Sequence, residues 1–159
     1  MARRGPAKPQ VIQPDPIYGD ILVTKLINRA MHDGKKSVSQ KQIYKAFELI
    51  KEKTNEDPMV VFGTALDAIR PTMEVRSRRV GGAAYQVPMQ VRGERKNSLA
   101  IRWLIEFSRK RSNSEFHTFA EKLAAEIMDA TKGEGASVKK RQEMERSAEA
   151  NRAFAHFRW

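Results

Sequence analysis

The chain has 159 residues, no cysteine, and 30 Lys and Arg against 19 Asp and Glu, which gives a formal net charge of +11. The length is typical of one domain with its own core, and the lack of cysteine excludes disulfides and thiolate metal sites. A charge this positive is self-repulsive unless a polyanion offsets it, so nucleic acid is the first expected partner. An anionic membrane surface is the alternative, although no apolar run reaches the roughly 18 residues of a membrane span.

Residues 1–16 are predicted to form an extended basic tail. Four prolines in this segment prevent a regular helix, and no apolar pattern marks a packed face. Arg3, Arg4 and Lys8 give the tail its positive charge. Such a tail either lacks fixed structure or becomes ordered along a phosphate backbone, and both interpretations remain open.

The first helix is predicted to start after Asp20, a suitable N-cap, and to run to about Met31. Gly34 is the predicted C-cap, because glycine adopts the left-handed conformation that ends many helices. The apolar residues of this segment recur at helical spacing and predict a buried stripe. They are Leu22, Val23, Leu26, Ile27 and Ala30.

Two more helices are predicted before the next change of pattern. Ser37 or Ser39 opens the second, and Asp57-Pro58 opens the third with proline at its first position. Pro71 ends the third helix. Their predicted inward residues are Ile43, Ala46, Phe47 and Ile50 in the second helix and Phe62, Ala65, Leu66 and Ile69 in the third.

Residues 72–92 change to a two-residue alternation that predicts a β-hairpin. Gly81-Gly82 separates two alternating segments, and paired glycines suit a tight hairpin turn because both can adopt positive φ. Neither strand carries enough apolar surface to bury a face, so we expect a projecting arm. Residues 70–96 hold seven basic and two acidic residues, or +5 of the net +11.

The arm is predicted to present arginines and one tyrosine to a partner. With a two- or four-residue loop, Arg76 and Arg78 share a face with Tyr85. Arginine binds phosphate bidentately or reads a base edge, and tyrosine stacks on exposed bases. The alternative is an ordinary hairpin whose arginines are only solvated.

Three further helices are predicted after the arm. The fourth starts at Glu94 or Asn97, and the fifth is capped by Ser112 or Ser114 and broken at Gly133. The predicted inward residues of these two helices are Leu99, Ala100, Trp103, Leu104, Phe107, Phe116, Phe119, Ala120, Leu123 and Ile127. The sixth, from Ser137 to about Ala150, has few apolar residues and is expected to pack on one side only or to lie at the surface. Residues 151–159 form a short aromatic tail that packs on the domain or meets a partner. The predicted fold is therefore mainly α: one domain at 17–150 with about six helices and a two-stranded arm at 72–92.

Three basic clusters lie at predicted helix ends. Lys35-Lys36 precedes a helix start, where ammonium and free backbone N–H groups together can bind phosphate. Arg109 to Arg111 ends the fourth helix, where cations also favour the helix dipole without any ligand. Lys139 to Arg141 begins the sixth helix, where positive charge opposes the dipole, and this favours an external anion.

No catalytic residue, metal site or cofactor is predicted. His32, His117 and His156 show no metal-ligand spacing, and neither a phosphate-binding loop nor a nucleophile elbow is present. An RNA-modifying enzyme would need such a constellation. An architectural DNA binder remains the rival from sequence, although such proteins often carry an apolar or proline wedge at the arm tip. Here the tip is Gly81-Gly82, and Pro88 lies well down the strand.

Several segments resemble one protein family. RSRRVGGAAYQVPMQVR, NSLAIRW, VKKRQEMERSAEANRAFAHFRW and PDPIYGDILVTKLINRAMHDGKKS are similar to the bacterial small-subunit ribosomal protein seven family over nearly the whole chain. One departure is Gln42-Ile43, where the family usually has two adjacent apolar residues. The resemblance implies a helical domain with a β-hairpin and no enzymatic activity.

The resemblance also implies a function and partners. The expected role is a primary ribosomal RNA binder that nucleates assembly of the head of the small subunit, in the cytoplasm and within the ribosome. It further implies a place at the subunit interface near exit-site tRNA and mRNA, beside small-subunit proteins nine and eleven. The expected tRNA- and mRNA-proximal arm residues are Arg78, Arg79, Gly81, Gly82 and Tyr85. The expected ribosomal RNA contacts are Arg3, Arg4, Lys8, Lys35, Lys36, Arg76, Arg78, Arg79, Arg92, Arg95, Lys96, Arg102, Arg109, Lys110, Arg111, Lys139, Lys140 and Arg141.

Overall fold

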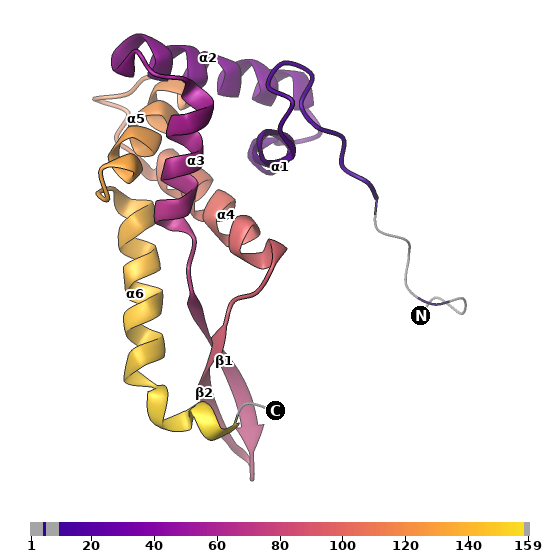
Figure 1. Cartoon of the computed structure of the whole chain (residues 1–159), viewed down its shortest axis with the longest axis vertical. Coiled ribbons are helices and arrows are strands. Elements are labelled where there is room, and N and C mark those ends of the chain that lie inside the picture. The colour runs from indigo at the N-terminus through magenta and orange to yellow at the C-terminus, as the bar shows by residue number, and fades with distance from the viewer. Residues whose placement is uncertain (1–4, 6–9, 158–159) are drawn as a thin grey trace.

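The chain folds into a helical body with one projecting hairpin, as Figure 1 shows. The computed structural model describes residue 5 and residues 10–157. Six α-helices, a 3₁₀ helix and a two-stranded antiparallel sheet in this part confirm the predicted mainly α fold. In chain order the elements are α1 (Ile21–Ala30), α2 (Lys36–Thr54), α3 (Pro58–Ile69), β1 (Met73–Val80), β2 (Ala83–Gln90), α4 (Glu94–Lys110), α5 (Phe119–Thr131), α6 (Ala136–Ala150) and η1 (Arg152–Phe157).

Two predicted helix starts are confirmed by their capping side chains. The Asp20 carboxylate accepts a hydrogen bond from the Leu22 backbone N–H at 2.8 Å. The Asp57 carboxylate accepts one from Met59 N–H at 2.9 Å, with Pro58 at the first helical position. Each aspartate satisfies one backbone donor that has no partner inside the helix, which fixes where α1 and α3 begin.

The predicted role of Gly34 is wrong. Helix α1 ends at Ala30, and the backbone N–H of Met31 donates to the Ile27 carbonyl at 3.0 Å. Gly34 instead takes φ +73° in the tight turn before α2, where its carbonyl accepts from Lys36 N–H at 2.8 Å. The second helix therefore begins at Lys36, before the two serines proposed as its start.

The predicted start of the fifth helix is also wrong. The Thr118 hydroxyl accepts from Glu121 N–H, and the Glu121 carboxylate accepts from Thr118 N–H, each at 3.3 Å. This reciprocal capping box starts α5 after Thr118. Ser112 and Ser114 lie in the preceding turn with their hydroxyls 2.6 Å apart.

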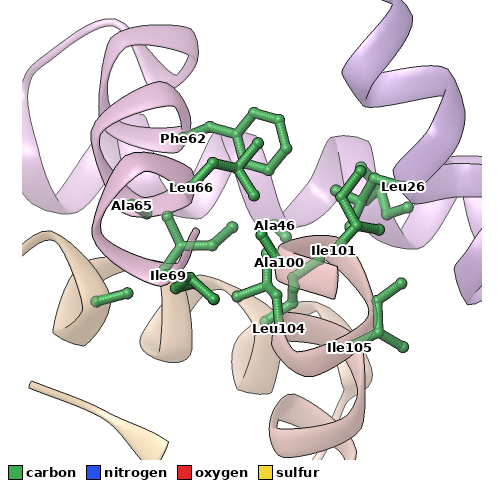
Figure 2. Packing of buried hydrophobic residues seen from close by; sticks show 14 of the residues in the cluster. Leu26, Ala46, Phe62, Ala65, Leu66, Ile69, Ala100, Ile101, Leu104 and Ile105 are labelled. Carbon is green, nitrogen blue, oxygen red and sulfur yellow. The ribbon is translucent and has the colours of Figure 1, made fainter. Parts of the chain in front are cut away.

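The hydrophobic core lies among the first five helices, and α5 packs against α2, α3 and α4. Figure 2 shows Phe62, Leu66 and Ile69 of α3 facing Ala100 and Leu104 of α4. All five side chains are almost completely buried. These buried side chains form part of the contact between α3 and α4.

The N-terminal segment is anchored at Asp15, which is buried. Its carboxylate accepts hydrogen bonds from the Tyr44 hydroxyl at 2.8 Å and from the backbone N–H groups of Ile17 and Tyr18. The extended tail predicted for residues 1–16 thus ends in a fixed turn against α2.

The hairpin has the predicted two-residue turn. Val80 pairs with Ala83, and Gly81 and Gly82 have φ +58° and +88°. The register places Arg76 opposite Val87 and Arg78 opposite Tyr85, which confirms that these side chains share a face. In Figure 1 the arm extends away from the helical body with α6 alongside it.

The arm is less isolated than the sequence indicates. Val87 and Pro88 are buried near its foot, whereas most other strand residues are exposed or partly exposed. Helix α6 contacts β1 and buries Val138 and Ala148 on one side only, as predicted. The 3₁₀ helix η1 then packs against β2, so the C-terminal residues within the described part pack on the domain.

Candidate nucleic-acid interface

A basic groove of about 430 Å³ lies between α1 and α4. Its charged lining consists of Arg29, Arg102, Arg109, Lys110 and Glu106, and the buried Ile105 also lines it. Four cations against one carboxylate give the groove a positive potential. A hydrogen bond from Lys110 holds the pKa of the Glu106 carboxyl below its ordinary value, and the charges of Lys140 and Arg102 add to this effect.

A second groove, of about 440 Å³, lies between the α1–α2 turn and the segment that joins α4 to α5. Lys35, Arg109 and Lys122 contribute positive charge, and His32 and His117 also line it. Arg109 lines both grooves, so the two adjoin at this residue.

Two side chains fix the walls of the second groove. The Arg109 guanidinium donates to the Ala30 carbonyl at 2.8 Å, where the end of α1 leaves acceptors free. The Gln42 side-chain oxygen accepts from Ala120 N–H at 3.3 Å. Gln42 therefore satisfies a backbone donor in the first turn of α5.

The run from Arg109 to Arg111 divides into three environments. Arg109 is exposed between the grooves, and Lys110 donates to Glu106 at 2.6 Å on the surface. Arg111 turns inward: its side chain is 19% exposed, and it pairs with Glu126 at 2.7 Å and with Asp129. Of the three residues predicted to contact phosphate, Arg111 is the least accessible, and its guanidinium already has two carboxylate partners.

Glu126 is the centre of this internal network. Its carboxylate is 1% exposed and accepts from Arg111 Nε at 2.9 Å and from the backbone N–H and hydroxyl of Ser137 at 2.9 and 2.6 Å. The network joins the end of α4, the middle of α5 and the start of α6. It is a structural joint, because a buried carboxylate needs such partners.

A second charged cluster lies at the foot of the arm. The buried Glu74 carboxylate binds Arg76 of β1 at 2.6 Å and Arg95 of α4 at 2.7 Å. Burial raises the pKa of the Glu74 carboxyl. The hydrogen bonds and charges of Arg95 and Arg76 together lower this pKa by more than burial raises it, so it lies below its ordinary value. Both guanidinium side chains stay about half exposed.

Toward the tip of the arm, Arg79, Gly81 and Gly82 are exposed and Arg78 is partly exposed. Tyr85 differs from the prediction of a tyrosine presented to a partner. Its ring is half-buried and lies 5.3 Å from the Phe154 ring and 5.1 Å from the Phe157 ring, centre to centre. The C-terminal aromatic rings thus pack against Tyr85 and leave less of its ring available for stacking on a base.

The remaining predicted residues lie at separate places. Arg92 is exposed and Lys96 partly exposed near the foot of the arm, while Lys36 begins α2. In α6, Lys139 is exposed, Lys140 pairs with Glu143, and Arg141 lies 3.7 Å from Glu145. Arg3, Arg4 and Lys8 lie outside the described residues.

Arg29 is the main basic residue that the sequence reasoning missed. It lies in the last turn of α1 and lines the groove with Arg102 and Arg109. A signal was present, because Lys25 and Arg29 are four residues apart on the polar side of an amphipathic helix. Their proximity to α4 could not be read from that pattern.

Among the residues that the structure describes, no group of His, Cys, Asp and Glu has an arrangement that could hold a metal ion. Within the same part of the chain, every helix is too short or too polar to cross a bilayer.

Comparison with known proteins places the chain in a family. A family described as Ribosomal protein S7p/S5e matches residues 2–152. The small ribosomal subunit protein uS7 of Caldicellulosiruptor bescii is 55% identical over 159 residues, covering all of both chains. The uS7 proteins of Carboxydothermus hydrogenoformans and Bifidobacterium longum subsp. infantis are 55% and 54% identical over the same full length. A match over so much of the chain shows that it belongs to the ribosomal protein S7p/S5e family, whose bacterial relatives here are the uS7 proteins.

Proposed function

We propose that this chain is a structural, non-catalytic protein of the small ribosomal subunit that binds ribosomal RNA, in the cytoplasm and within the ribosome. The observation that carries the proposal is the pair of cation-lined grooves that adjoin at Arg109. Grooves lined by several cations and few carboxylates favour a phosphate backbone over a neutral ligand. The full-length similarity to small-subunit proteins supplies the choice of ribosomal RNA.

We also infer a more specific role from membership of this family. The protein nucleates assembly of the head of the small subunit, and its arm lies near exit-site tRNA and mRNA at the subunit interface. Small-subunit proteins nine and eleven are its neighbours. The projecting arm with exposed Arg79 and an exposed glycine tip supports this role, because a narrow arm can reach past the RNA that holds the body.

Among the described residues, the proposed RNA contacts are exposed or partly exposed cations. Arg29 joins the predicted set, and Arg111 is left out because its side chain is only 19% exposed and already pairs with two carboxylates. The contacts are Arg29, Lys35, Lys36, Arg76, Arg78, Arg79, Arg92, Arg95, Lys96, Arg102, Arg109, Lys110, Lys139, Lys140 and Arg141, with the tail residues Arg3, Arg4 and Lys8.

A salt titration of RNA binding tests the proposal. The affinity of the full chain for transcribed small-subunit ribosomal RNA should fall by about 0.7–0.9 log units per phosphate contact for each decade of salt. The double variant Arg29→Gln and Arg102→Gln should lower this slope by about two contacts. A matched control is Lys51→Gln with Lys53→Gln, which removes the same charge from the exposed last turn of α2.

Three outcomes would overturn the proposal. They are a flat salt response, equal effects of the two double variants, and preference for duplex DNA in competition. For the arm, a photo-crosslinker at residue 79 in assembled subunits should capture tRNA or mRNA, whereas one at the exposed residue 60 should not. Equal capture from both positions would contradict the placement of the arm.

A further inference from the structure

The charged cluster at the foot of the arm has features beyond those of an ion pair that only joins β1 to α4. One buried carboxylate, Glu74, holds two guanidinium groups that remain about half exposed, at 49% for Arg76 and 50% for Arg95. Glu74 Oε1 accepts from Arg76 Nε at 2.7 Å, and Oε2 accepts from Arg95 Nε and Nη2 at 2.8 and 2.7 Å. The two arginines come from different elements, β1 and α4.

The same edge of both guanidinium groups is used. Glu74 contacts Nε and Nη2 of Arg76 and Nε and Nη2 of Arg95. A guanidinium has five N–H groups in a rigid plane. Among the described residues, the hydrogen bonds and ion pairs of both arginines to Glu74 use Nε and Nη2 and not Nη1, so each plane is held along one edge while about half of each side chain stays exposed.

The charges of this cluster are unbalanced. Two guanidinium ions and one carboxylate leave a net +1 at a partly exposed position. Arg95 also lies in the first turn of α4, where a cation opposes the helix dipole, and Gly93 provides no capping side chain there. One singly charged anion on the outer edges would balance the cluster.

We propose that Glu74 is a positioning residue that fixes Arg76 and Arg95 as a clamp for one phosphate group of the RNA backbone at the foot of the arm. This inference rests on the proposed function. Planar arginine forks bind phosphate oxygens in pairs, and orienting them beforehand reduces the rotamer entropy lost on binding. Glu74 also offsets the repulsion that would otherwise separate the two guanidinium groups.

The substitution Glu74→Gln tests this inference, because simple electrostatics and positioning give opposite signs. Removing a negative charge from an RNA-binding protein should strengthen binding. If Glu74 orients the two arginines, affinity for transcribed small-subunit ribosomal RNA should instead fall at least fivefold, and the salt slope should decrease by about one contact. Glu149→Gln removes the same charge from an exposed pair with Arg152 and should leave affinity unchanged or slightly stronger.

A double-mutant cycle locates the effect. In a background with Arg76→Gln and Arg95→Gln, the further change Glu74→Gln should have no effect on affinity. If Glu74→Gln binds as tightly as the wild type, or if its effect persists in that background, the inference fails. In either case, steep salt-dependent binding by the wild type would leave the proposed function standing, whereas absent wild-type binding would overturn the function itself.

A second variant covers the case in which Glu74→Gln loosens the arm. Arg76→Lys and Arg95→Lys keep both charges and the pairing with Glu74 but lose the outward fork. Amide hydrogen exchange of the hairpin should stay at the wild-type level while RNA affinity falls several-fold. Wild-type affinity in this double lysine variant would overturn the clamp.

Discussion

Replacement of Arg111 by methionine distinguishes an internal role from an RNA contact. The side chain of methionine is apolar and of similar length, so packing is largely kept while the charge is lost. Glu126, which is 1% exposed, then loses the guanidinium that binds it through Nε and Nη2. The variant therefore leaves a buried carboxylate without its cationic partner.

The magnitude follows from the contacts that remain. Breaking a buried ion pair from one side costs about 3–5 kcal/mol. Ser137 still donates its backbone N–H and its hydroxyl to Glu126, so the loss should lie near the lower end, at about 3 kcal/mol. Lys110→Met provides the control: its pair with Glu106 lies on the surface, with 61% of the lysine side chain exposed. That change should cost less than about 0.5 kcal/mol.

Urea unfolding at neutral pH measures both changes, provided that the slope with denaturant stays constant. RNA affinity, measured where both variants are folded, should fall for Lys110→Met and stay within about twofold for Arg111→Met. The opposite pattern would refute this assignment. An unchanged urea midpoint together with a large loss of RNA affinity in Arg111→Met would mean that Arg111 faces the RNA.

Three further predictions concern the arm. Tyr85→Ala removes ring contacts with Phe154 that are worth about 0.5–1.5 kcal/mol per aromatic pair. Amide exchange in the outer half of the hairpin should therefore accelerate, while amide exchange in α1 to α5 should not change. Unchanged protection of the hairpin would mean that these ring contacts do not stabilise it. Gly82→Ala should destabilise the protein by about 1–2 kcal/mol, because a side chain is strained at φ +88°. Gly63→Ala, within α3 and equally free of neighbours within 4 Å, should instead stabilise it by up to about 1 kcal/mol, and the same sign for both would refute the strain argument. The lowered pKa of Glu74 stabilises the folded protein at a pH above the ordinary carboxyl pKa of 4.5, and this stabilisation disappears as the pH falls through the lower pKa of the folded state. The unfolding free energy of Glu74→Gln should therefore fall less steeply with acid than that of the wild type. Parallel curves of unfolding free energy against pH would contradict this prediction.

Local signals explain the parts of the fold that were predicted correctly. Asp20 and Asp57 cap their helices through atoms two residues away, and Gly81-Gly82 makes a turn that depends only on its own backbone angles. The correct start of α5 could also have been predicted from local sequence. Thr118 and Glu121 have the spacing of a capping box, yet the nearer serines were preferred as caps.

The candidate interface was predictable in composition but not in arrangement. Clusters of basic residues were visible in the sequence, whereas the grooves depend on α1 lying beside α4 and on the α1–α2 turn lying near α5. Arg29 illustrates the difference. The sequence predicts its position on a polar helix face. Its place beside Arg102 follows only from the packing of two helices that are far apart in the chain.

The sequence by itself determined the helical class, the hairpin and its turn, and the excess of positive charge, because each depends on composition or on residues a few positions apart. Tertiary structure alone decided the environment of each cation. Arg109, Lys110 and Arg111 are adjacent in the chain, yet only Arg111 meets the carboxylates of Glu126 and Asp129 on α5. Whether an arginine is available to RNA depends on which carboxylates the fold brings to it, and those carboxylates come from elements that no local pattern connects.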